Sequence, residues 1–280
     1  MSNATTPSAE LDLELQSAMM SSLRNHPAMP DDTQIETLLR ERTRFRHLRH
    51  VPSCPSTQEL ALERPRDAQG HLVEAVFWAD HQTRGRGRQQ REWHDEPAAD
   101  LAVTFRIEAD LPKPLELPAA LPVAVALACE PLAGVPLRIK WPNDVFLHGR
   151  KLCGVLIDAG TLGPNTYLIG IGINCNRVRF PPDLETIATS LALATGREVD
   201  RGQLLVALAT QIDAALDALL TRRPAALEEV FRDRLGLMGR RVRVENNEVH
   251  EGTLRAMNFT HLELDGGRSI ALATVRSIRA

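Results

Sequence analysis

The sequence predicts an α+β fold, in which helices cover a central sheet and a small β-barrel follows. Short apolar segments rich in Val, Ile, Leu and aromatic residues recur from Glu74 onward, bounded by Gly, Pro and Asp, a pattern typical of strands. Two longer segments carry apolar residues at helical spacing. After Leu235 only short strand-like segments remain. The 280 residues suffice for one large domain and a small one, or for two domains.

The elements of the large domain follow from these patterns. The expected strands are Glu74–Ala79, Leu101–Ile107, Leu137–Trp141, Lys151–Asp158 and Thr166–Ile173, and the expected helices are Pro118–Gly134, Gly202–Leu220 and Ala225–Leu235. The His148-Gly149 step tolerates positive φ and predicts a hairpin over Leu147–Lys151. Beyond a boundary near Gly236–Gly239, five short strands separated by the 245–248 and Asp265-Gly266-Gly267 turns indicate a small barrel.

Composition excludes several classes of protein. With 43% apolar and 25% charged residues, disorder, a disulfide miniprotein and a fibrous repeat are disfavoured. The 33 basic and 36 acidic residues give a net charge of −3, so no global positive field attracts nucleic acid. The cysteines Cys54, Cys129, Cys153 and Cys175 show neither CxxC nor metal-ligand spacing, which favours reduced thiols. We find no targeting segment and no near-continuous apolar run of ~18 residues, and expect a cytoplasmic protein without membrane contact.

The N-terminal part is less informative. Residues 1 to about 35 are rich in Ser, Ala, Pro, Met and acidic residues and predict a mobile arm or short helices. The basic run Arg40–His50 is typical of a solvated face or a strand edge. We assign it no chemistry.

Arginines concentrate over Arg84–Arg91, where two glycines allow a backbone to approach a ligand. Three interpretations stay open from the residues alone: a loop that covers a phosphate or adenylate, an RNA-binding Arg-Gly tract, or a solvated loop. Lys140–Asp144 closes a strand with Pro, Asn and Asp, which also fits an ordinary turn. Lys151 enters an apolar strand across the expected hairpin, as either a catalytic or a snorkelled lysine.

Two further segments have a structural and a functional interpretation. Glycines alternate within Gly170–Asn176, which marks the close approach of a ligand or tight packing against another backbone. Ser56 begins a helix-start signature that ends at Glu59, and a plain N-cap explains it equally well.

Taken in order, Ser56-Thr57-Gln58, the Gln82–Trp93 segment, Lys140–Val145, Gly149–Asp158 and Gly170–Asn176 resemble the motifs of biotin protein ligases (biotin–[acetyl-CoA-carboxylase] ligases) of the monofunctional type, without an N-terminal DNA-binding domain. The order and spacing of five motifs is more specific than any one of them. The resemblance runs from about His47 to the C-terminus.

The resemblance implies an architecture. It implies a variable N-terminal arm over residues 1–45. A catalytic domain over 46–235 would follow, with a mixed sheet backed by helices, related to lipoate ligases and class II aminoacyl-tRNA synthetases. An SH3-like β-barrel would occupy residues 236–280.

The resemblance also implies a two-step reaction. Biotin and ATP give biotinyl-5′-AMP and pyrophosphate, and a lysine of a biotin carboxyl carrier protein then displaces AMP. Carboxylate and triphosphate gather negative charge that cations must offset. Catalysis is carried over to Lys151, Arg88 and Asp144. Biotin binding is carried over to Ser56, Thr57, Gln58, Gln82, Arg86, Gly87, Arg88, Lys151 and Gly154, and ATP binding to Arg86, Arg88, Arg91, Trp93, Asn143, Lys151, Asn174 and Asn176.

Cofactor and partner expectations follow from the same resemblance. No side-chain cluster for a metal is expected. Mg²⁺ would arrive with ATP, with Asp144 as a candidate ligand. We expect a monomer or homodimer without specific DNA binding.

Two positions depart from the family pattern. Gln90 stands where a glycine is usual, and Gln58 where an asparagine is usual. The first affects loop mobility and the second one biotin contact.

Three other functions compete with this one. They are a lipoate or octanoate ligase of the same fold, a bifunctional biotin-operon repressor, and an RNA-binding protein that uses the Arg-Gly loop. The Arg loop, Lys140–Asp144 and the terminal barrel together disfavour the first. Fewer than 50 mostly irregular residues ahead of the motifs disfavour the repressor. The acidic net charge and the single tyrosine disfavour RNA binding.

Overall fold

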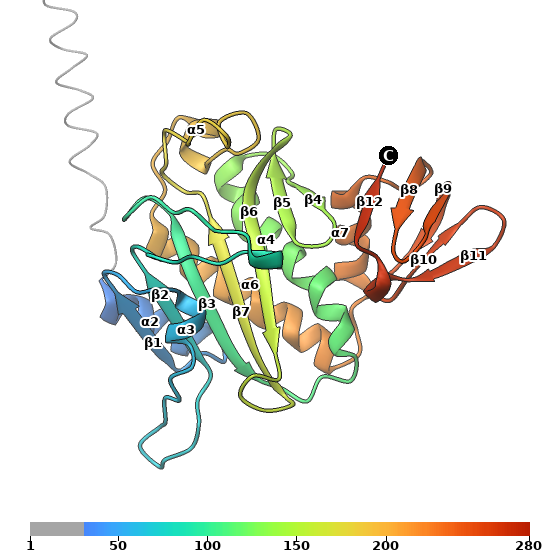
Figure 1. Ribbon diagram of the computed structural model, residues 1–280. Coiled ribbons are helices and arrows are strands. Elements are labelled where there is room, and N and C mark those ends of the chain that lie inside the picture. Colours follow the sequence, from blue (N-terminus) through green and yellow to red (C-terminus); the bar gives the residue numbers. More distant parts are fainter. Residues whose placement is uncertain (1–30) are drawn as a thin grey trace, which may run out of the picture.

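Two sheets organise the protein (Figure 1). The computed structural model describes residues 31–280. The large sheet has seven strands in the order β1-β2-β3-β7-β6-β5-β4. Their bounds are β1 His47–Val51, β2 Ala75–Ala79, β3 Leu101–Glu108, β4 Arg138–Lys140, β5 Asp144–Leu147, β6 Arg150–Ala159 and β7 Thr166–Ile173. β1 runs parallel to β2 and the other neighbours are antiparallel, so the expected mixed sheet is confirmed.

The three helices that apolar periodicity predicts are confirmed. The α-helices are α2 Asp32–Arg42, α3 Thr57–Leu60, α4 Leu117–Ala133, α5 Leu191–Thr195, α6 Arg201–Leu220 and α7 Ala225–Leu235, with 3₁₀ turns η1 Arg88–Gln90, η2 Pro114–Glu116 and η3 Leu272–Thr274. The predicted helices are α4, α6 and α7, and the structure adds α2, α3 and α5. α4 ends at Gly134 with φ +69°, a conformation that costs glycine little. α6 begins where Asp200 accepts a hydrogen bond from the Gln203 backbone N–H at 3.0 Å.

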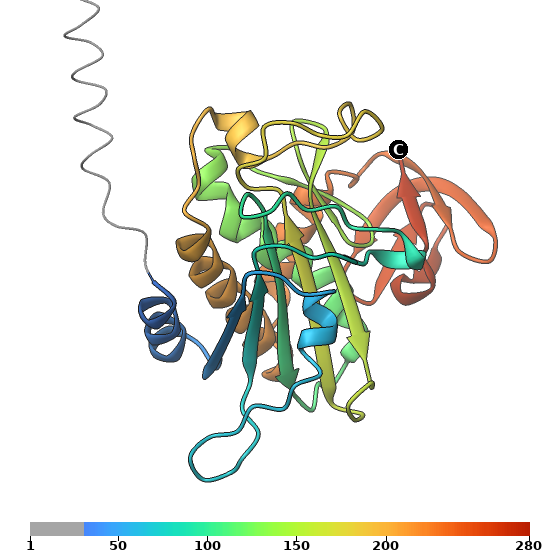
Figure 2. The ribbon, with the colours of Figure 1, turned by 60° about the vertical axis from the view of Figure 1, so that its left-hand side comes forward.

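The two faces of the large sheet are covered differently. Val103, Phe105 and Ile107 of β3 join one core with residues of α4 and α6. Phe77 and Leu168 belong to a smaller cluster with Leu60 of α3. Figure 2 shows α2 and α6 on one side of the strands and α3 on the other. The large core therefore lies under the helices, and the α3 face is left for polar side chains and glycines.

The hairpin predicted at His148-Gly149 is confirmed. β5 and β6 pair antiparallel, and His148 and Gly149 between them have φ of +51° and +77°. Two positive φ values in a two-residue loop match the twist of the flanking strands. The register pairs Lys151 with Phe146 and places Gly154 opposite Asp144, the first residue of β5.

The second sheet contains the C-terminal strands in the order β11-β10-β9-β8-β12. These are β8 Arg241–Glu245, β9 Val249–Met257, β10 His261–Leu264, β11 Arg268–Ala271 and β12 Ser277–Arg279. Phe231 of α7 contacts Phe259 edge-on at 5.5 Å, and the Trp141 indole N–H donates to the Val275 carbonyl at 2.8 Å. The small sheet is therefore attached to the large domain beside Trp141.

The expected N-terminal arm over residues 1–45 can be compared with the structure only from Asp31 onward. Residues 1–30, which hold most of the expected arm, lie outside the described residues. Ile35, Leu39 and Phe45 are at most 1% exposed and belong to the main core. This differs from an arm that reaches to residue 45, because helix α2 buries an apolar face that its many charged residues obscure in the sequence.

Two helices contradict the expectation that no apolar stretch reaches the length of a membrane span. Pro114–Ala133 and Arg201–Leu220 are each 20 residues long and apolar enough to pass that test. In the fold, 67% and 50% of their most apolar windows are buried. The apolar residues of these helices pack against the large sheet in the main core.

Candidate active site

Hydrogen bonds on the α3 face involve four of the predicted residues and one that was not predicted, Thr104. The Thr57 backbone N–H donates to Gln82 Oε1 at 2.8 Å, and the Thr57 hydroxyl lies 3.2 Å from the same oxygen. Thr104 of β3 donates its hydroxyl to that of Thr57 at 2.8 Å. Ser56 caps α3, accepting from the Gln58 N–H at 3.3 Å. Because a backbone N–H can only donate, Gln82 must present its Oε1 to Thr57 and its Nε2 elsewhere.

Gln58, one of the two departures from the family pattern, packs against Gly170 of β7. Its Nε2 lies 3.3 Å from the Leu156 carbonyl. A Cβ at Gly170 would come within 2.8 Å of that Nε2. Gln58 Oε1 is buried without a hydrogen-bond partner among the described residues. A buried acceptor of this kind is costly unless a ligand supplies a donor.

Trp93 packs flat on two more glycines. A Cβ at Gly172 would meet the Trp93 ring at 2.3 Å, and one at Gly154 would meet it at 3.3 Å. The alternating glycines of Gly170–Asn176 are therefore explained by close approach of side chains. Within the described part of the chain, the buried Trp93 indole N–H also has no acceptor.

Lys151 and Asp144 face each other across the β5–β6 hairpin. Lys151 Nζ lies 2.7 Å from Asp144 Oδ1, with the two side chains 34% and 22% exposed. The same ammonium lies 5.7 Å from the centre of the Trp93 ring. The structure thus brings Lys151 and Asp144, two of the three residues expected to be catalytic, close to Gly154 and Trp93.

The arginine-rich segment forms a hairpin. Gly87 N–H donates to the Arg91 carbonyl at 2.7 Å, and Trp93 N–H donates to the Gly85 carbonyl at 3.0 Å. Within residues 31–280, no carboxylate lies within 4.0 Å of the cationic groups of Arg86, Arg88 and Arg91. Their charge is therefore available to an anionic ligand.

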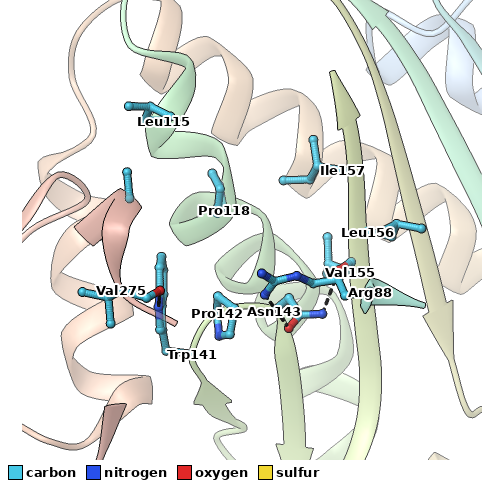
Figure 3. A pocket seen from close by; sticks show the side chains of 11 residues that line it. Arg88, Leu115, Pro118, Trp141, Pro142, Asn143, Val155, Leu156, Ile157 and Val275 are labelled. Carbon is cyan, nitrogen blue, oxygen red and sulfur yellow. Dashed lines mark hydrogen bonds between the residues drawn. The ribbon is translucent and has the colours of Figure 1, made fainter. Parts of the chain in front are cut away.

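Arg88 and Asn143 meet at a cavity of about 240 Å³ beside β6 (Figure 3). Arg88 Nη1 donates to Asn143 Oδ1 at 3.3 Å, and Asn143 Nδ2 donates to the Val155 carbonyl at 3.0 Å. Trp141, Pro118 and Val275 form the apolar walls. The cavity therefore combines an arginine and an amide with flat apolar surface.

The two asparagines after β7 are engaged with backbone. Asn174 Nδ2 donates to the Thr189 carbonyl at 3.0 Å. Asn176 uses both ends of its amide on Val199, donating to its carbonyl at 2.9 Å and accepting from its N–H at 2.8 Å. Asn176 therefore anchors Val199 with one hydrogen bond at each end of its amide, and its expected role at the adenylate stays a prediction.

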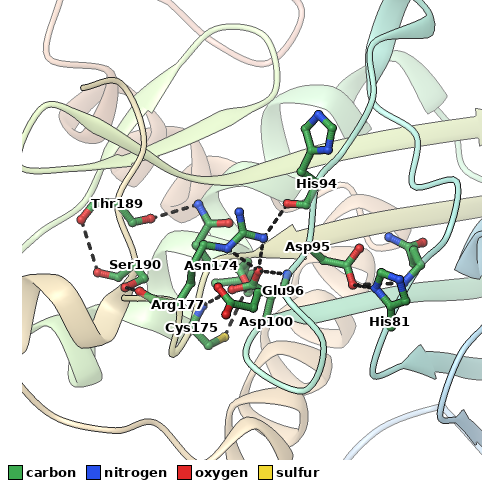
Figure 4. A network of polar contacts seen from close by, with 12 residues as sticks. His81, His94, Asp95, Glu96, Asp100, Asn174, Cys175, Arg177, Thr189 and Ser190 are labelled. Atoms are coloured by element: carbon green, nitrogen blue, oxygen red, sulfur yellow. Dashed lines mark hydrogen bonds and ion pairs between the residues drawn. The ribbon is translucent and has the colours of Figure 1, made fainter. Parts of the chain in front are cut away.

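A buried ion pair beneath the site had no local signal in the sequence. Asp100 and Arg177 are 1% and 3% exposed at their side chains and lie in contact (Figure 4). Arg177 also donates to the His94 carbonyl at 2.7 Å. Burial raises the pKa of Asp100, and the neighbouring guanidinium opposes that rise. Residues 77 positions apart have no spacing rule to connect them, so only the fold reveals this pair.

His81 and Asp95 are a second unpredicted pair. Asp95 Oδ2 accepts from the Gln82 N–H at 3.0 Å and lies 3.1 Å from His81 Nδ1. Asp95 lies outside the motifs that predicted the site, and only the fold shows its contact with Gln82.

The described residues hold no group of three or more His, Cys, Asp or Glu side chains placed to bind a metal ion. All four cysteines are free. Burial raises the pKa of Cys54 to about 11, which disfavours a thiolate. The described residues therefore offer cations, amides, hydroxyls and the carboxylates of Asp144 and Asp95 at this site.

Comparisons with known proteins agree with these features. A sequence model of the "Biotin/lipoate A/B protein ligase family" matches residues 52–176. The biotin–[acetyl-CoA-carboxylase] ligase of Mycobacterium tuberculosis is 29% identical over 231 residues, covering 79% of this chain and 83% of that protein. The bifunctional ligase/repressor BirA of Bacillus spizizenii is 35% identical over 183 residues, covering 62% of this chain and 55% of the relative. The chain thus spans about half the length of the BirA relatives.

Solved structures share the fold. The biotin protein ligase of Aquifex aeolicus, determined in complex with biotin and ATP, superposes with a TM-score of 0.72 at 26% identity, covering 84% of this chain and 99% of that one. The matched residues 52–176 contain Ser56, Gln82, Trp93, Asp144 and Lys151. Residues 52–176 therefore match the biotin/lipoate A/B protein ligase family as a domain, and the fold around them is shared with a solved biotin protein ligase.

Proposed function

We propose that this chain is a biotin protein ligase. It activates biotin with ATP to biotinyl-5′-AMP, releasing pyrophosphate, and transfers biotin to a lysine of a biotin carboxyl carrier protein. One observation carries the proposal. Lys151, Asp144 and Trp93 lie together against the glycines of β6 and β7. Gln58 and Gln82 lie on the same face of the sheet. Those residues come from five separate parts of the sequence.

The α3 face supplies groups that match biotin's ureido ring. That ring offers one carbonyl acceptor and two N–H donors. Gln58 Oε1 is a buried acceptor without a partner in the described structure, and an N–H donor would satisfy it. Gln82 Nε2, turned away from Thr57, is a donor for the carbonyl. Each unpaired buried group costs about 1–3 kcal/mol, so this pairing favours biotin over a ligand without polar ring atoms. Thr57 holds the Gln82 side chain through its backbone N–H, and Ser56 caps the helix that carries Gln58.

Cations act on the charge that develops during adenylation. A carboxylate oxygen of biotin forms a bond to the α-phosphorus of ATP while the bond to the pyrophosphate oxygen breaks. Lys151, Arg86 and Arg88 stabilise the oxygens on which charge accumulates, and Gly87 lets the loop backbone approach. In the second step the carrier lysine attacks the biotinyl carbonyl and AMP leaves. Asp144 is positioned to orient that amine once Lys151 turns toward the phosphate.

The nucleotide is assigned to the Arg88–Asn143 cavity and its surroundings. Asn143 offers amide groups, and Arg88 and Arg91 offer charge near the phosphates. Trp93 provides a flat aromatic surface for the base. Asn174 stays a candidate through its Oδ1. Asn176 stays a candidate as well, because Val199 takes only one of its two amide N–H groups and one lone pair of its oxygen.

Mg²⁺ fits this site only as a partner of ATP. Asp144 is the carboxylate that contacts Lys151, and a single carboxylate with substrate phosphates is a usual environment for this ion. The ion would offset phosphate charge when bound. Lys151 holds Asp144 in place until then.

The remaining assignments concern the whole chain. We assign residues 46–235 to the catalytic domain and 236–280 to an SH3-like barrel. Strand β9 pairs with both β8 and β10, and the register shifts at Glu263/Leu264, an irregularity typical of strands that curve in small barrels. The protein acts in the cytoplasm as a monomer or homodimer, without specific DNA binding.

Incubation with ATP, Mg²⁺, biotin and a purified biotin carboxyl carrier domain tests the proposal. Avidin blotting should detect biotin on the carrier only when ATP is present. A carrier whose target lysine is replaced by arginine should stay unlabelled. Absence of labelling in the complete reaction would contradict the proposal.

BirA relatives at 35% identity bear the name ligase/repressor, which makes operator binding the second candidate function. Fluorescence anisotropy with promoter DNA of the host's biotin genes, with biotin and ATP present, distinguishes the two. A specific complex that survives ~200 mM salt at nanomolar protein would support a repressor, since non-specific contacts give only ~10⁻⁴–10⁻⁶ M affinity.

A further inference from the structure

Asp95 lies at the neck of the arginine-rich hairpin, next to the residue assigned to biotin. Its side chain is only 1% exposed. Oδ2 accepts from the Gln82 N–H at 3.0 Å and lies 3.1 Å from His81 Nδ1 (Figure 4). Oδ1 is buried and has no hydrogen-bond partner among the described residues. A buried carboxylate with one unsatisfied oxygen destabilises a fold, so it calls for an explanation.

The contact lies just beyond the backbone ladder of the hairpin. Gly87 pairs with Arg91 and Trp93 pairs with Gly85 through backbone hydrogen bonds. In the same register Thr83 would pair with Asp95, but the Thr83 N–H donates to the Cys54 carbonyl at 2.9 Å, and the Asp95 carboxylate takes the neighbouring Gln82 N–H. The two ends of the loop are therefore joined at Gln82 by a side chain.

Gln82 is thereby held from two sides. Its backbone is fixed by Asp95, and its side-chain oxygen is fixed by the Thr57 N–H at 2.8 Å. These two contacts fix the orientation of the Gln82 amide, so that its Nε2 points toward Gly85. A Cβ added at Gly85 would lie 3.2 Å from that nitrogen. Preorganised donors lose less entropy on binding than free ones.

We propose that Asp95 is a positioning residue for biotin, which acts through Gln82 and does not touch the substrate. The inference rests on the proposed ligase function and extends it to the residue that orients the biotin donor. The acceptor oxygen of Asp95 is the group that matters, because it takes the Gln82 backbone N–H.

A kinetic test uses biotin-dependent ATP–pyrophosphate exchange with the full chain. Asp95→Ala removes the acceptor and should raise the KM for biotin about tenfold or more, while kcat and the KM for ATP change less than about threefold. Asp95→Asn keeps an acceptor oxygen and should stay within about threefold of wild type. Thermal unfolding of each variant shows whether it is folded.

Asp67 offers a matched control. Its carboxylate also accepts a backbone N–H, that of His71 at 2.8 Å, and lies 3.2 Å from a histidine Nδ1. It makes the same kinds of contact in the 62–74 loop, away from Gln82. Asp67→Ala should leave the KM for biotin unchanged.

A double-mutant cycle separates positioning from a general structural role. If Asp95 acts through Gln82, Asp95→Ala should have no further effect on the KM for biotin in a Gln82→Ala background. Additive effects would overturn the inference. So would an unchanged KM in Asp95→Ala, or an Asp95→Asn variant as impaired as Asp95→Ala. Should Asp95→Ala not fold, Asp95→Ser, whose hydroxyl is too short to reach Gln82, takes its place in the cycle.

The outcomes also distinguish the inference from the function on which it rests. Wild-type protein without biotin-dependent exchange would overturn both. Wild-type protein with exchange and a KM indifferent to Asp95 would overturn the inference alone.

Discussion

At the residue scale, the contact between Lys151 and Asp144 sets the charge at the centre of the site. Lys151 Nζ lies 2.7 Å from Asp144 and is one third exposed, so it can turn toward a phosphate. Lys151→Ala should lower biotin-dependent pyrophosphate exchange by about 100-fold or more, as loss of a preorganised charge does. Lys113→Ala, which removes a lysine 64% exposed at its side chain, is the control. Exchange above about a third of the wild-type rate would remove Lys151 from catalysis.

The glycines of β6 and β7 give a graded prediction. A Cβ at Gly172 would lie 2.3 Å from the Trp93 ring, but one at Gly154 would lie 3.3 Å from it. Gly172→Ala must therefore displace Trp93 and should lower adenylation about tenfold or more. Gly154→Ala should have a smaller effect, because a neighbour at that distance needs to move little. Equal rates for both variants and wild type would show that contact with Trp93 is unimportant.

What the sequence reveals at this scale depends on local order. Lys151, Asp144, Trp93 and Gln82 are predictable because they stand in motifs with fixed spacing. Thr104 and Asp95 act through partners that the folded chain supplies, and Asn176 stands in a motif while its amide also anchors Val199. A motif identifies a position without showing which atoms remain free.

At the element scale, the arginine-rich hairpin combines few backbone hydrogen bonds with concentrated charge. Four arginines within eight residues repel one another until an anion binds, and ordering glycines costs entropy. Loop amides over Arg84–Arg91 should therefore exchange quickly in the free protein and slowly with biotinyl-AMP bound. Amides of α6 serve as the internal reference in the same hydrogen-exchange experiment. Equal protection of the loop in both states would refute ligand-induced ordering.

The longer elements were predictable and the short ones were not. α4 and α6 have many apolar residues at helical spacing, and the β5–β6 hairpin has its His-Gly turn. α2 is charged over most of its surface and buries only Ile35 and Leu39. β1 is a basic edge strand whose pairing with β2 depends on a partner 28 residues away. Burial supplied by distant neighbours leaves little trace in local sequence.

At the scale of the whole molecule, a buried glutamate links stability to pH. Burial raises the pKa of Glu74 to about 7, against the opposing effect of Arg44. A carboxyl whose folded pKa lies above its unfolded value binds more protons when folded, so its contribution to stability falls as pH rises from about 4.5 to about 7.

Glu74→Gln removes this titration while Arg44 keeps its contacts with Asp213 and Asp217. The free energy of unfolding of the variant, relative to wild type, should increase by on the order of 1–3 kcal/mol between pH 5 and pH 8. Urea unfolding at the two pH values measures it. Glu248→Gln, at a side chain 78% exposed, should show no such change. A Glu74→Gln difference that is the same at both pH values would contradict the linkage.

The account of the whole molecule depends on one claim, that this fold activates biotin with ATP. ATP–pyrophosphate exchange measures that step directly and needs no carrier protein. We predict exchange with biotin, which is lost in Lys151→Ala, and no exchange when lipoate or octanoate replaces biotin. Exchange with lipoate or octanoate in place of biotin, or no exchange with biotin in a folded protein, would contradict the account.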